Sequence, residues 1–308
     1  MPELPEVETI VRELEKKIVG LRIKDAWIDR PKIVRQTGGV EVFKKAINNK
    51  KILSVKRRAK YIIINIEGKK TIFIHQKISG HLLYGKWKRT EGKWESLLPG
   101  PLKDDADNKY IRLILFFNNG FQLALSDLRR FAKIILADDN KIDALKEIRE
   151  LGPEPLEIDF KIFHKLFESA GHRILRGPAK GGGRRKKGRI KPVLMDPQFI
   201  AGIGNIYGDE ILWEAGFHPL SRAENLNAKD VKKIFDAIQK VLKKAILHKG
   251  DSIDNYRTTS GEKGEYQNIQ KAYQQTGKKC AKKDGGIIQR LKIGARSAHS
   301  CSKHQILK

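Results

Sequence analysis

The hydrophobic periodicity of the chain changes once, at the Pro- and Gly-rich stretch LGPEPLE (151–157). Before it, short apolar runs with strand-like alternation follow one another, among them KILSVKRRAKYIIINI (51–66), which is expected to be one strand. The break NNG between YIRLILFF and FQLALSD is typical of a β-hairpin. After it, apolar residues recur at helical spacing within 159–170, 204–216 and 227–250. A boundary between two periodicities predicts two domains of different class.

The first domain is predicted to span residues 1–137 as a mostly antiparallel β domain with one N-terminal helix. The helix is expected over 2–19, because Pro5 suits a first turn, apolar residues form one stripe, and Gly20 can end it. The stretch 90–108 is expected to be a solvated loop. A helical domain is predicted over 151–262, followed by a tail, 266–308, with strand-like pieces around two cysteines.

Charge indicates the partner. The chain carries 63 Lys+Arg against 36 Asp+Glu, a formal charge of +27, and such a surplus favours a polyanion such as nucleic acid. A membrane is the alternative, but no segment approaches the roughly 18 apolar residues of a spanning helix. The start lacks a signal-peptide pattern, and the only cysteines are Cys280 and Cys301, so we expect a reducing cytoplasm.

A basic, glycine-rich segment lies at 176–191, RGPAKGGGRRKKGRIK, with eight basic residues and no acid. It is expected to be a flexible loop, and its charge makes Arg185 and Lys191 candidate phosphate contacts. A basic run of this kind binds a backbone without sequence specificity.

The first residues, MPELPEVETI, offer a nucleophile. Removal of Met1 would leave Pro2 with a free secondary amine, which is partly unprotonated at neutral pH and could attack C1′ of a deoxyribose. Glu3 and Glu6 could both lie beside that amine, one carboxyl donating a proton and the other holding a water or stabilising the cation. The alternative is that Pro and Glu are ordinary residues of a helical first turn.

Two further motifs follow strand-like runs. Lys60 ends the basic cluster VKRRAK and enters a strand, where it either contacts a phosphate or is simply exposed. In SDLRRF, Arg129 and Phe131 alternate with Arg130, so a period of two would place them on one face, suited to filling the space left by an extruded base. The alternative is a core phenylalanine beside a solvated arginine.

The last motifs lie in the second half. Gly202 and Gly204 lead into a helix start, so backbone N–H groups and the Asn205 amide could cradle a phosphate. In the tail, Cys301 and His304 form half of a zinc site to which Cys280 could add a third ligand.

Together these motifs resemble the formamidopyrimidine-DNA glycosylase family. PELPEVETI, RRAKY, SGHL, DLRRF, LGPEPL, the long GNIYGDEILWEAGFHP segment and the C-terminal finger remnant occur in the family's order, essentially end to end. The opening PELPE favours this family over its sister, endonuclease VIII, which typically opens PEGPE. The resemblance implies an α+β fold: an N-terminal antiparallel β-sandwich with an N-terminal helix, a helix–two-turns–helix domain and a zinc-finger-like β-hairpin.

The resemblance also implies an activity: excision of oxidised purines such as 8-oxoguanine and formamidopyrimidines, then β,δ-elimination at the abasic site, in base excision repair. It makes Pro2 the Schiff-base nucleophile, Glu3 the acid and Glu6 an acidic residue near the sugar. Lys60 matches the lysine assigned to β-elimination, and Arg296 the finger arginine assigned to δ-elimination. It assigns DNA contacts to Asn205, Arg129 and Phe131.

Three departures from the family pattern stand out. The loop His-Leu-Gly-Met-Ser-Gly reads HQKISG here, so Ile78 replaces the methionine that inserts into DNA. Tyr110 or Arg112 stands where members often carry a histidine. The finger lacks its second and last cysteines, and Asp284 could complete a set with Cys280, Cys301 and His304. One structural zinc ion, or a packed hairpin without metal, are the two expectations.

The predicted partner is double-stranded DNA that contains oxidised bases or abasic sites, bound by a monomer in the bacterial cytoplasm, with no membrane partner. Two other functions are kept open: an endonuclease VIII-like glycosylase for oxidised pyrimidines, and a DNA-binding relative without catalysis. The presence of Pro2, Glu3 and Lys60 argues against the second.

Overall fold

The computed structural model describes residues 1–103, 105–168, 188–253 and 256–308. The chain divides into two compact units, Met1–Ile148 with Ile246–Gln267, and Arg149–Ala245 with Asn268–Lys308. A segment far along the chain therefore completes the N-terminal unit. Each unit is described by itself.

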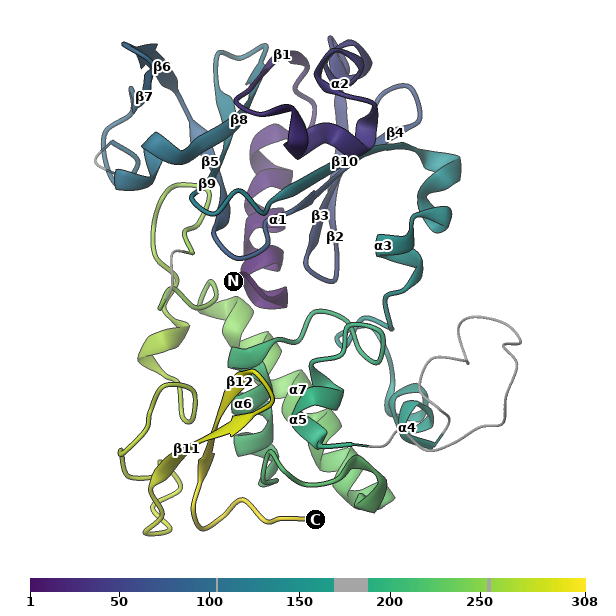
Figure 1. Ribbon diagram of the computed structural model, residues 1–308, viewed down its shortest axis with the longest axis vertical. Helices are drawn as coiled ribbons and strands as arrows, with labels where there is room; N and C mark the ends of the chain where they lie inside the picture. Colours follow the sequence, from purple (N-terminus) through teal and green to yellow (C-terminus); the bar gives the residue numbers. More distant parts are fainter. Residues whose placement is uncertain (104, 169–187, 254–255) are drawn as a thin grey trace. The chain divides into compact units, whose positions relative to one another are not determined.

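The first unit is a β-sandwich of two four-stranded antiparallel sheets, ordered β1-β8-β9-β5 and β10-β4-β3-β2, with a separate hairpin β6-β7 (Figure 1). The helices are α1 (Leu4–Ile18) and α2 (Val40–Ile47), and 3-10 turns cover Pro31–Thr37, Ala106–Tyr110 and Asp139–Ala144. The strands are β1 (Ile23–Ile28), β2 (Ile52–Arg58), β3 (Tyr61–Ile66), β4 (Lys70–His75), β5 (Gly80–Gly85), β6 (Trp87–Thr90), β7 (Lys93–Ser96), β8 (Ile111–Phe117), β9 (Gln122–Asp127) and β10 (Lys133–Asp138).

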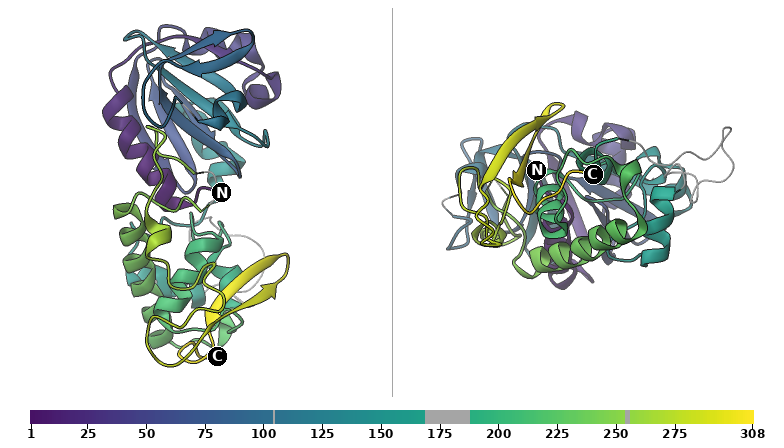
Figure 2. Two further views of the ribbon diagram at one scale, coloured as in Figure 1. Left: turned by 90° about the vertical axis from the view of Figure 1, so that its left-hand side faces the viewer. Right: turned by 90° about the horizontal axis from the view of Figure 1, so that it is seen from below.

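The core of this unit lies between the two sheets and against α1, which packs along the sandwich (Figure 2). The predicted stripe of α1 is buried as expected, and Ile10 and Leu14 are 0% exposed. Burying one such side chain stabilises the fold by about 1.5–3 kcal/mol. The α1 stripe therefore fixes the helix, and with it the N-terminal residues, to the sheets.

Two expectations for this unit need correction. The run 51–66 is not one strand: Ala59, with φ 53°, turns the chain between β2 and β3, which pair with each other. The stretch 90–108 is not only a solvated loop, because β7 pairs with β6 there and Leu102 packs in a second small core. The NNG hairpin between β8 and β9 is confirmed.

The second unit is helical with a C-terminal hairpin. Its segments are α4 (Phe160–Glu168), α5 (Ile190–Leu194), α6 (Asn205–Ala215), α7 (Ala228–Leu247), a 3-10 turn at Ala223–Asn225, and the hairpin β11 (Ile288–Ile293) and β12 (Arg296–Cys301). The short helix α3 (Lys146–Arg149) and the 3-10 turn Tyr266–Asn268 lie where the chain passes between the units. The helices predicted within 159–170, 204–216 and 227–250 are confirmed.

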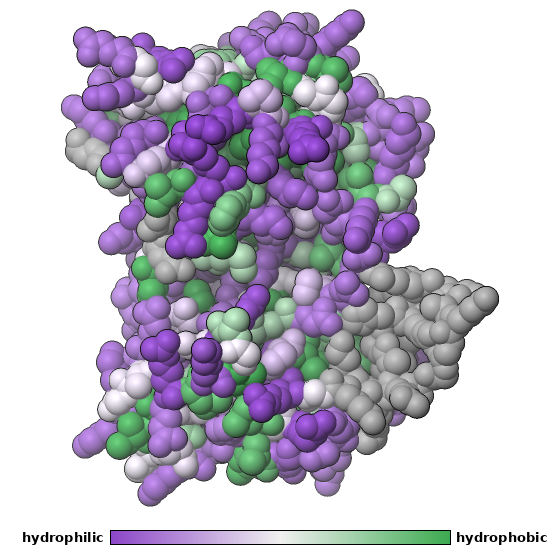
Figure 3. All heavy atoms as spheres, in the orientation of Figure 1, coloured by the Kyte–Doolittle hydropathy of each residue, from purple (hydrophilic) through white to green (hydrophobic). Residues whose placement is uncertain are grey.

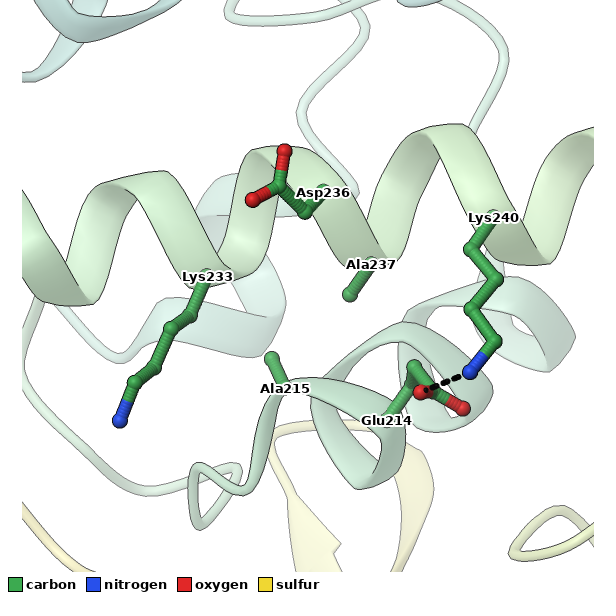
Figure 4. Close-up of a pocket in the computed structure, with 6 residues that line it drawn as sticks. All are labelled: Glu214, Ala215, Lys233, Asp236, Ala237 and Lys240. Atoms are coloured by element: carbon green, nitrogen blue, oxygen red, sulfur yellow. Dashed lines mark hydrogen bonds and ion pairs between the residues drawn. The ribbon is translucent and has the colours of Figure 1, made fainter.

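Figure 4 shows how α6 and α7 meet around a shallow pocket. Ala215 of α6 and Ala237 of α7 point toward each other with short side chains. Beside them, Lys240 Nζ of α7 lies 2.6 Å from Glu214 Oε1 of α6.

Hydrophilic side chains predominate over the face shown in Figure 3, in keeping with the many charged residues of the sequence. No described helix is long and apolar enough to cross a membrane. The α+β class and the sandwich, helical and hairpin parts are as predicted.

Candidate active site and nucleic-acid interface

The N-terminal residues are held by the first turn of α1. Glu3 is the N-cap residue, and its backbone N–H donates to Glu6 Oε2 at 2.7 Å. Both side chains are buried, 2% and 1% exposed. A carboxylate at this third helical position satisfies one of the N–H groups that a helix start leaves open. Pro2 precedes the N-cap directly, so the positive end of the α1 dipole lies next to it.

The second oxygen of Glu6 is bound by a distant segment. Glu6 Oε1 accepts the backbone N–H of Asp251 at 2.8 Å, within the same unit. Gly250 has φ +78°, and a Cβ there would lie 2.6 Å from Glu6 Oε1. With both oxygens accepting N–H groups, Glu6 is suited to holding the N-terminus in place. Sequence reasoning missed Gly250 and Asp251, because nothing local in HKGDS indicates contact with residue 6.

Lys60 lies in the β2–β3 turn, at the end of the sheet where Tyr61 pairs with His75. Burial, with the charges of Lys77, Lys60 and Lys133, lowers the pKa of His75 to about 3. The neutral ring accepts the backbone N–H of Lys77 at Nδ1, 3.0 Å, which leaves Nε2 as a donor. Lys60, Lys77 and Lys133 thus form a cationic group around the neutral His75 ring, and such a group can bind a phosphate. Sequence reasoning did not single out His75.

Two loops at this end of the sandwich carry exposed side chains that face solvent. Ile78 is 41% and Phe131 is 54% exposed, and Arg129 is exposed as well. Arg129 and Phe131 do not lie on one face of a strand, which corrects the prediction, because β9 ends at Asp127 and Arg130 takes φ 60°. A loop, not a strand face, presents them.

Tyr110 and Arg112 differ in the partners that hold them, although the Arg112 guanidinium lies 5.8 Å from the Tyr110 ring centroid. Arg112 is engaged by Asp29, with 2.8 Å between Nη1 and Oδ2, and its Nε donates to the Asp127 carbonyl. Tyr110 is half-buried, with the Lys109 ammonium 5.0 Å from its ring centroid. Tyr110 is thus the better candidate of the two for a DNA contact.

In the second unit, Asn205 begins α6 directly after Gly204, as predicted. Its side-chain oxygen has no hydrogen-bond partner among the described residues. Arg296 is exposed at the tip of the β11–β12 hairpin, next to a pocket lined by Pro192, Met195 and Ile293. Arg185 lies outside the described residues.

Lys191 is not an exposed phosphate contact, which corrects the prediction. Its side chain is 2% exposed, its Nζ lies 2.7 Å from Asp209 Oδ1, and it donates to the Ser297 carbonyl at 2.7 Å. Asp209 also accepts the backbone N–H of His299 at 3.0 Å. An ammonium enclosed by these partners joins α5, α6 and β12, whose first residue is Arg296.

The four predicted metal ligands lie together, with all ligand atoms within 4.8 Å of one another. Cys280 Sγ is 3.4 Å from His304 Nδ1, Cys301 Sγ is 3.4 Å from Asp284 Oδ2, and His304 Nδ1 is 3.1 Å from that oxygen. Tetrahedral zinc with Zn–S of about 2.3 Å and Zn–N of about 2.0 Å gives edges of roughly 3.5 Å.

The surroundings of these ligands fit a metal ion. His304 Nε2 lies 3.0 Å from the Trp213 carbonyl, which fixes Nε2 as the protonated nitrogen and leaves the Nδ1 lone pair facing the cluster. Asp284 Oδ1 accepts the Gly286 N–H at 2.7 Å. The set of two thiols, one imidazole and one carboxylate can therefore hold one divalent ion.

Comparisons with known proteins place the chain in one family. Residues 1–134 match the family model of the formamidopyrimidine-DNA glycosylase N-terminal domain, and residues 151–257 that of the formamidopyrimidine-DNA glycosylase H2TH domain. Formamidopyrimidine-DNA glycosylases of Herpetosiphon aurantiacus and Pelotomaculum thermopropionicum are each 35% identical, with 98% and 100% of this chain covered and the same shares of those proteins.

Solved structures give the same relationship. The Lactococcus lactis Fpg in complex with DNA containing an abasic site has a TM-score of 0.80 at 32% identity, over 98% of this chain and 99% of that one. A point mutant of that protein, in complex with DNA containing Fapy-dG, has a TM-score of 0.81 at 31% identity, over 99% of both chains.

Proposed function

Because this chain belongs to the formamidopyrimidine-DNA glycosylase family, we propose that it excises oxidised purines, 8-oxoguanine and formamidopyrimidines, from duplex DNA and then cleaves the abasic strand, in base excision repair. One observation carries the proposal. Glu6 binds the backbone of Glu3 and so fixes the N-terminal residues at the positive end of α1. The relatives that bind abasic and Fapy-dG DNA support the substrate.

The reaction begins at Pro2 once Met1 has been removed. The proline nitrogen forms a bond to C1′ as the bond from C1′ to the base breaks, and Glu3 supplies the proton that leaves with the base. Opening of the sugar ring gives an iminium ion, which acidifies the C2′ hydrogens. Loss of a C2′ proton expels the 3′-phosphate, and loss of a C4′ proton then expels the 5′-phosphate. Water finally hydrolyses the iminium bond to Pro2 and releases the enzyme.

Other residues hold the DNA during these steps. Lys60, with neutral His75 beside it, is proposed to bind a phosphate and assist β-elimination, and Arg296 to serve the second elimination. Glu6 acts as the anchor of the N-terminus. Asn205 would contact a phosphate at the start of α6. Ile78, Arg129, Phe131 and Tyr110 are assigned to the duplex around the extruded base.

We assign the Cys280, Asp284, Cys301 and His304 set to one structural zinc ion, which would hold the hairpin that carries Arg296. A closed four-ligand set of this kind serves folding rather than chemistry. We propose that the enzyme acts on DNA in the bacterial cytoplasm, and the bacterial relatives reported above support this location.

Borohydride trapping tests the proposal. The purified protein should form a covalent adduct with an abasic duplex, and Pro2→Gly should lose it, whereas Pro5→Ala, within the same helical turn, should retain it. Absence of an adduct would leave a DNA-binding relative without catalysis. A panel of 8-oxoguanine, formamidopyrimidine and oxidised-pyrimidine duplexes separates the purine activity from an endonuclease VIII-like one.

A further inference from the structure

The two loops introduced above carry three exposed apolar side chains, Ile78 on one loop and Leu128 and Phe131 on the other. Ile78, Leu128 and Phe131 are 41%, 42% and 54% exposed. One loop joins β4 to β5 and the other joins β9 to β10, so each crosses from one sheet of the sandwich to the other. Exposed apolar groups gathered at one place indicate a binding surface.

The two loops leave the sheets at paired positions. Gly80 pairs with Asp127 in one sheet, and His75 pairs with Lys133 in the other. Both ends of the loop 76–79 are therefore in register with both ends of the loop 128–132. The two crossovers run side by side.

A buried carboxylate and a buried hydroxyl connect the loops. Ser79 Oγ donates to Asp127 Oδ1 at 2.5 Å and accepts the backbone N–H of Arg129 at 2.9 Å. The other oxygen, Asp127 Oδ2, accepts the backbone N–H of Ala132 at 2.8 Å. Asp127 is 0% and Ser79 is 6% exposed. Charge-assisted hydrogen bonds shielded from water are among the stronger ones, and removal of one partner leaves the other unsatisfied.

The backbone restricts the loops further. A Cβ at Gly80 would lie 2.4 Å from the Gln76 carbonyl oxygen, so this close turn requires glycine. Lys77 and Arg130, one in each loop, take left-handed φ values of 57° and 60°. Such conformations persist in side-chain-bearing residues only where their surroundings hold them.

We propose that Ser79 and Asp127 are positioning residues that join the two loops into one preformed wedge, in which Leu128 is an apolar member beside Ile78 and Phe131. The wedge inserts at a base step of duplex DNA, and this inference rests on the proposed glycosylase function. A wedge that is rigid before binding avoids the entropy of ordering two loops on the DNA. Neither Ser79 nor Asp127 touches the reacting atoms.

The experiment compares Ser79→Ala, Asp127→Ala and Asp127→Asn with Ser126→Ala in the full-length enzyme. Ser126 is the matched control, because it is 0% exposed, adjoins Asp127 in β9, and donates to the Asp107 carbonyl instead of the wedge. Two measurements are made: single-turnover excision from an 8-oxoguanine duplex, and stopped-flow fluorescence of 2-aminopurine placed next to the lesion, which reports unstacking.

Ser79→Ala and Asp127→Ala should each slow excision and 2-aminopurine unstacking together, by about ten- to a hundred-fold. Asp127→Asn, which keeps an oxygen for the Ala132 N–H, should lose less. The double substitution Ser79→Ala/Asp127→Ala should slow both rates by less than the product of the two single effects, because each single variant already removes the Ser79–Asp127 hydrogen bond. Schiff-base formation with an abasic site in single-stranded DNA should stay within about threefold, since no base step has to be opened there.

Two outcomes would overturn the inference: Ser79→Ala behaving like Ser126→Ala, or excision falling while the unstacking rate is unchanged. These are distinct from failure of the proposed function, in which the unsubstituted enzyme would excise none of the lesions. Leu128→Ala supplies a second test: like Ile78→Ala, it should slow unstacking.

Discussion

Lys191 Nζ lies 2.7 Å from Asp209 Oδ1, and neither side chain is more than 2% exposed. The pair lies within the second unit and connects α5 to α6, and the same ammonium binds the carbonyl of Ser297 in β12. Lys191, which the sequence places in a basic segment, is therefore a buried residue that connects elements of the fold. Its loss should affect folding before it affects DNA contact.

Lys191→Met should destabilise the second unit by about 3–5 kcal/mol, because it leaves the Asp209 carboxylate buried without its cation. Urea unfolding followed by circular dichroism measures this. Lys229→Met, at an exposed position on α7, should change stability by no more than about 0.5 kcal/mol. Adding Asp209→Asn to Lys191→Met should recover part of the loss, and equal behaviour of Lys191→Met and Lys229→Met would contradict the assignment.

The sequence predicted what periodicity and spacing control, and missed what depends on contacts between distant segments. The α1 stripe and the Cys301 and His304 pair follow from local spacing, whereas Asp284 was named from the comparison with the family's finger pattern, and all of these are present. The turn at Ala59 was missed because apolar residues continue on both sides of it. The role of Gly250 under Glu6, and of Asp127 between two loops, depends on residues far apart in sequence, which no local pattern records.

Glu3→Gln should separate the two halves of the reaction. An amide cannot give a proton to the departing base, so excision should fall by about 100-fold or more. A preformed abasic site needs no such proton, and borohydride trapping on it should stay within a few-fold. Glu15→Gln, exposed on α1, is the matched control and should leave both unchanged. Equal loss of both activities in Glu3→Gln would contradict the acid role.

Metal analysis should find about one zinc per chain, and a chelator should remove it with a loss of thermal stability, since metal binding is coupled to folding of such a hairpin. Cobalt substitution should give thiolate-to-metal charge-transfer bands in the near ultraviolet and the visible d–d bands of a tetrahedral site. Cys301→Ser should weaken binding of the ion, whereas Ser302→Ala, one residue further, should not. A chain purified without metal that chelator does not destabilise would favour the packed hairpin.

His75 should make stability depend on pH. Its pKa is lowered to about 3 in the fold, first by burial and then by Lys77, Lys60 and Lys133, against roughly 6.5 when unfolded. Between these values the unfolded chain binds a proton that the folded chain does not, so stability falls as the pH drops from 6.5 toward 3. The slope is at most about 1.4 kcal/mol per pH unit. Urea midpoints at pH 7.5 and 5 measure it, and His75→Gln should flatten the difference; an unchanged pH dependence in that variant would assign it to other groups.

Gln76 is buried in the loop that carries Ile78, and it stands where the resembling family has leucine. It is 1% exposed, and neither Oε1 nor Nε2 has a hydrogen-bond partner in the part of the chain that the structure describes. Gln76→Leu removes an unsatisfied amide at similar volume, so it should raise the free energy of unfolding by about 1–3 kcal/mol. Gln122→Leu should do the opposite, because that amide exchanges two 3.0 Å hydrogen bonds with the backbone of Trp87. If Gln76→Leu instead lowers the free energy of unfolding, the Gln76 amide has a hydrogen-bond partner in the folded protein. Loss of 2-aminopurine unstacking in the same variant would then place that partner in the wedge.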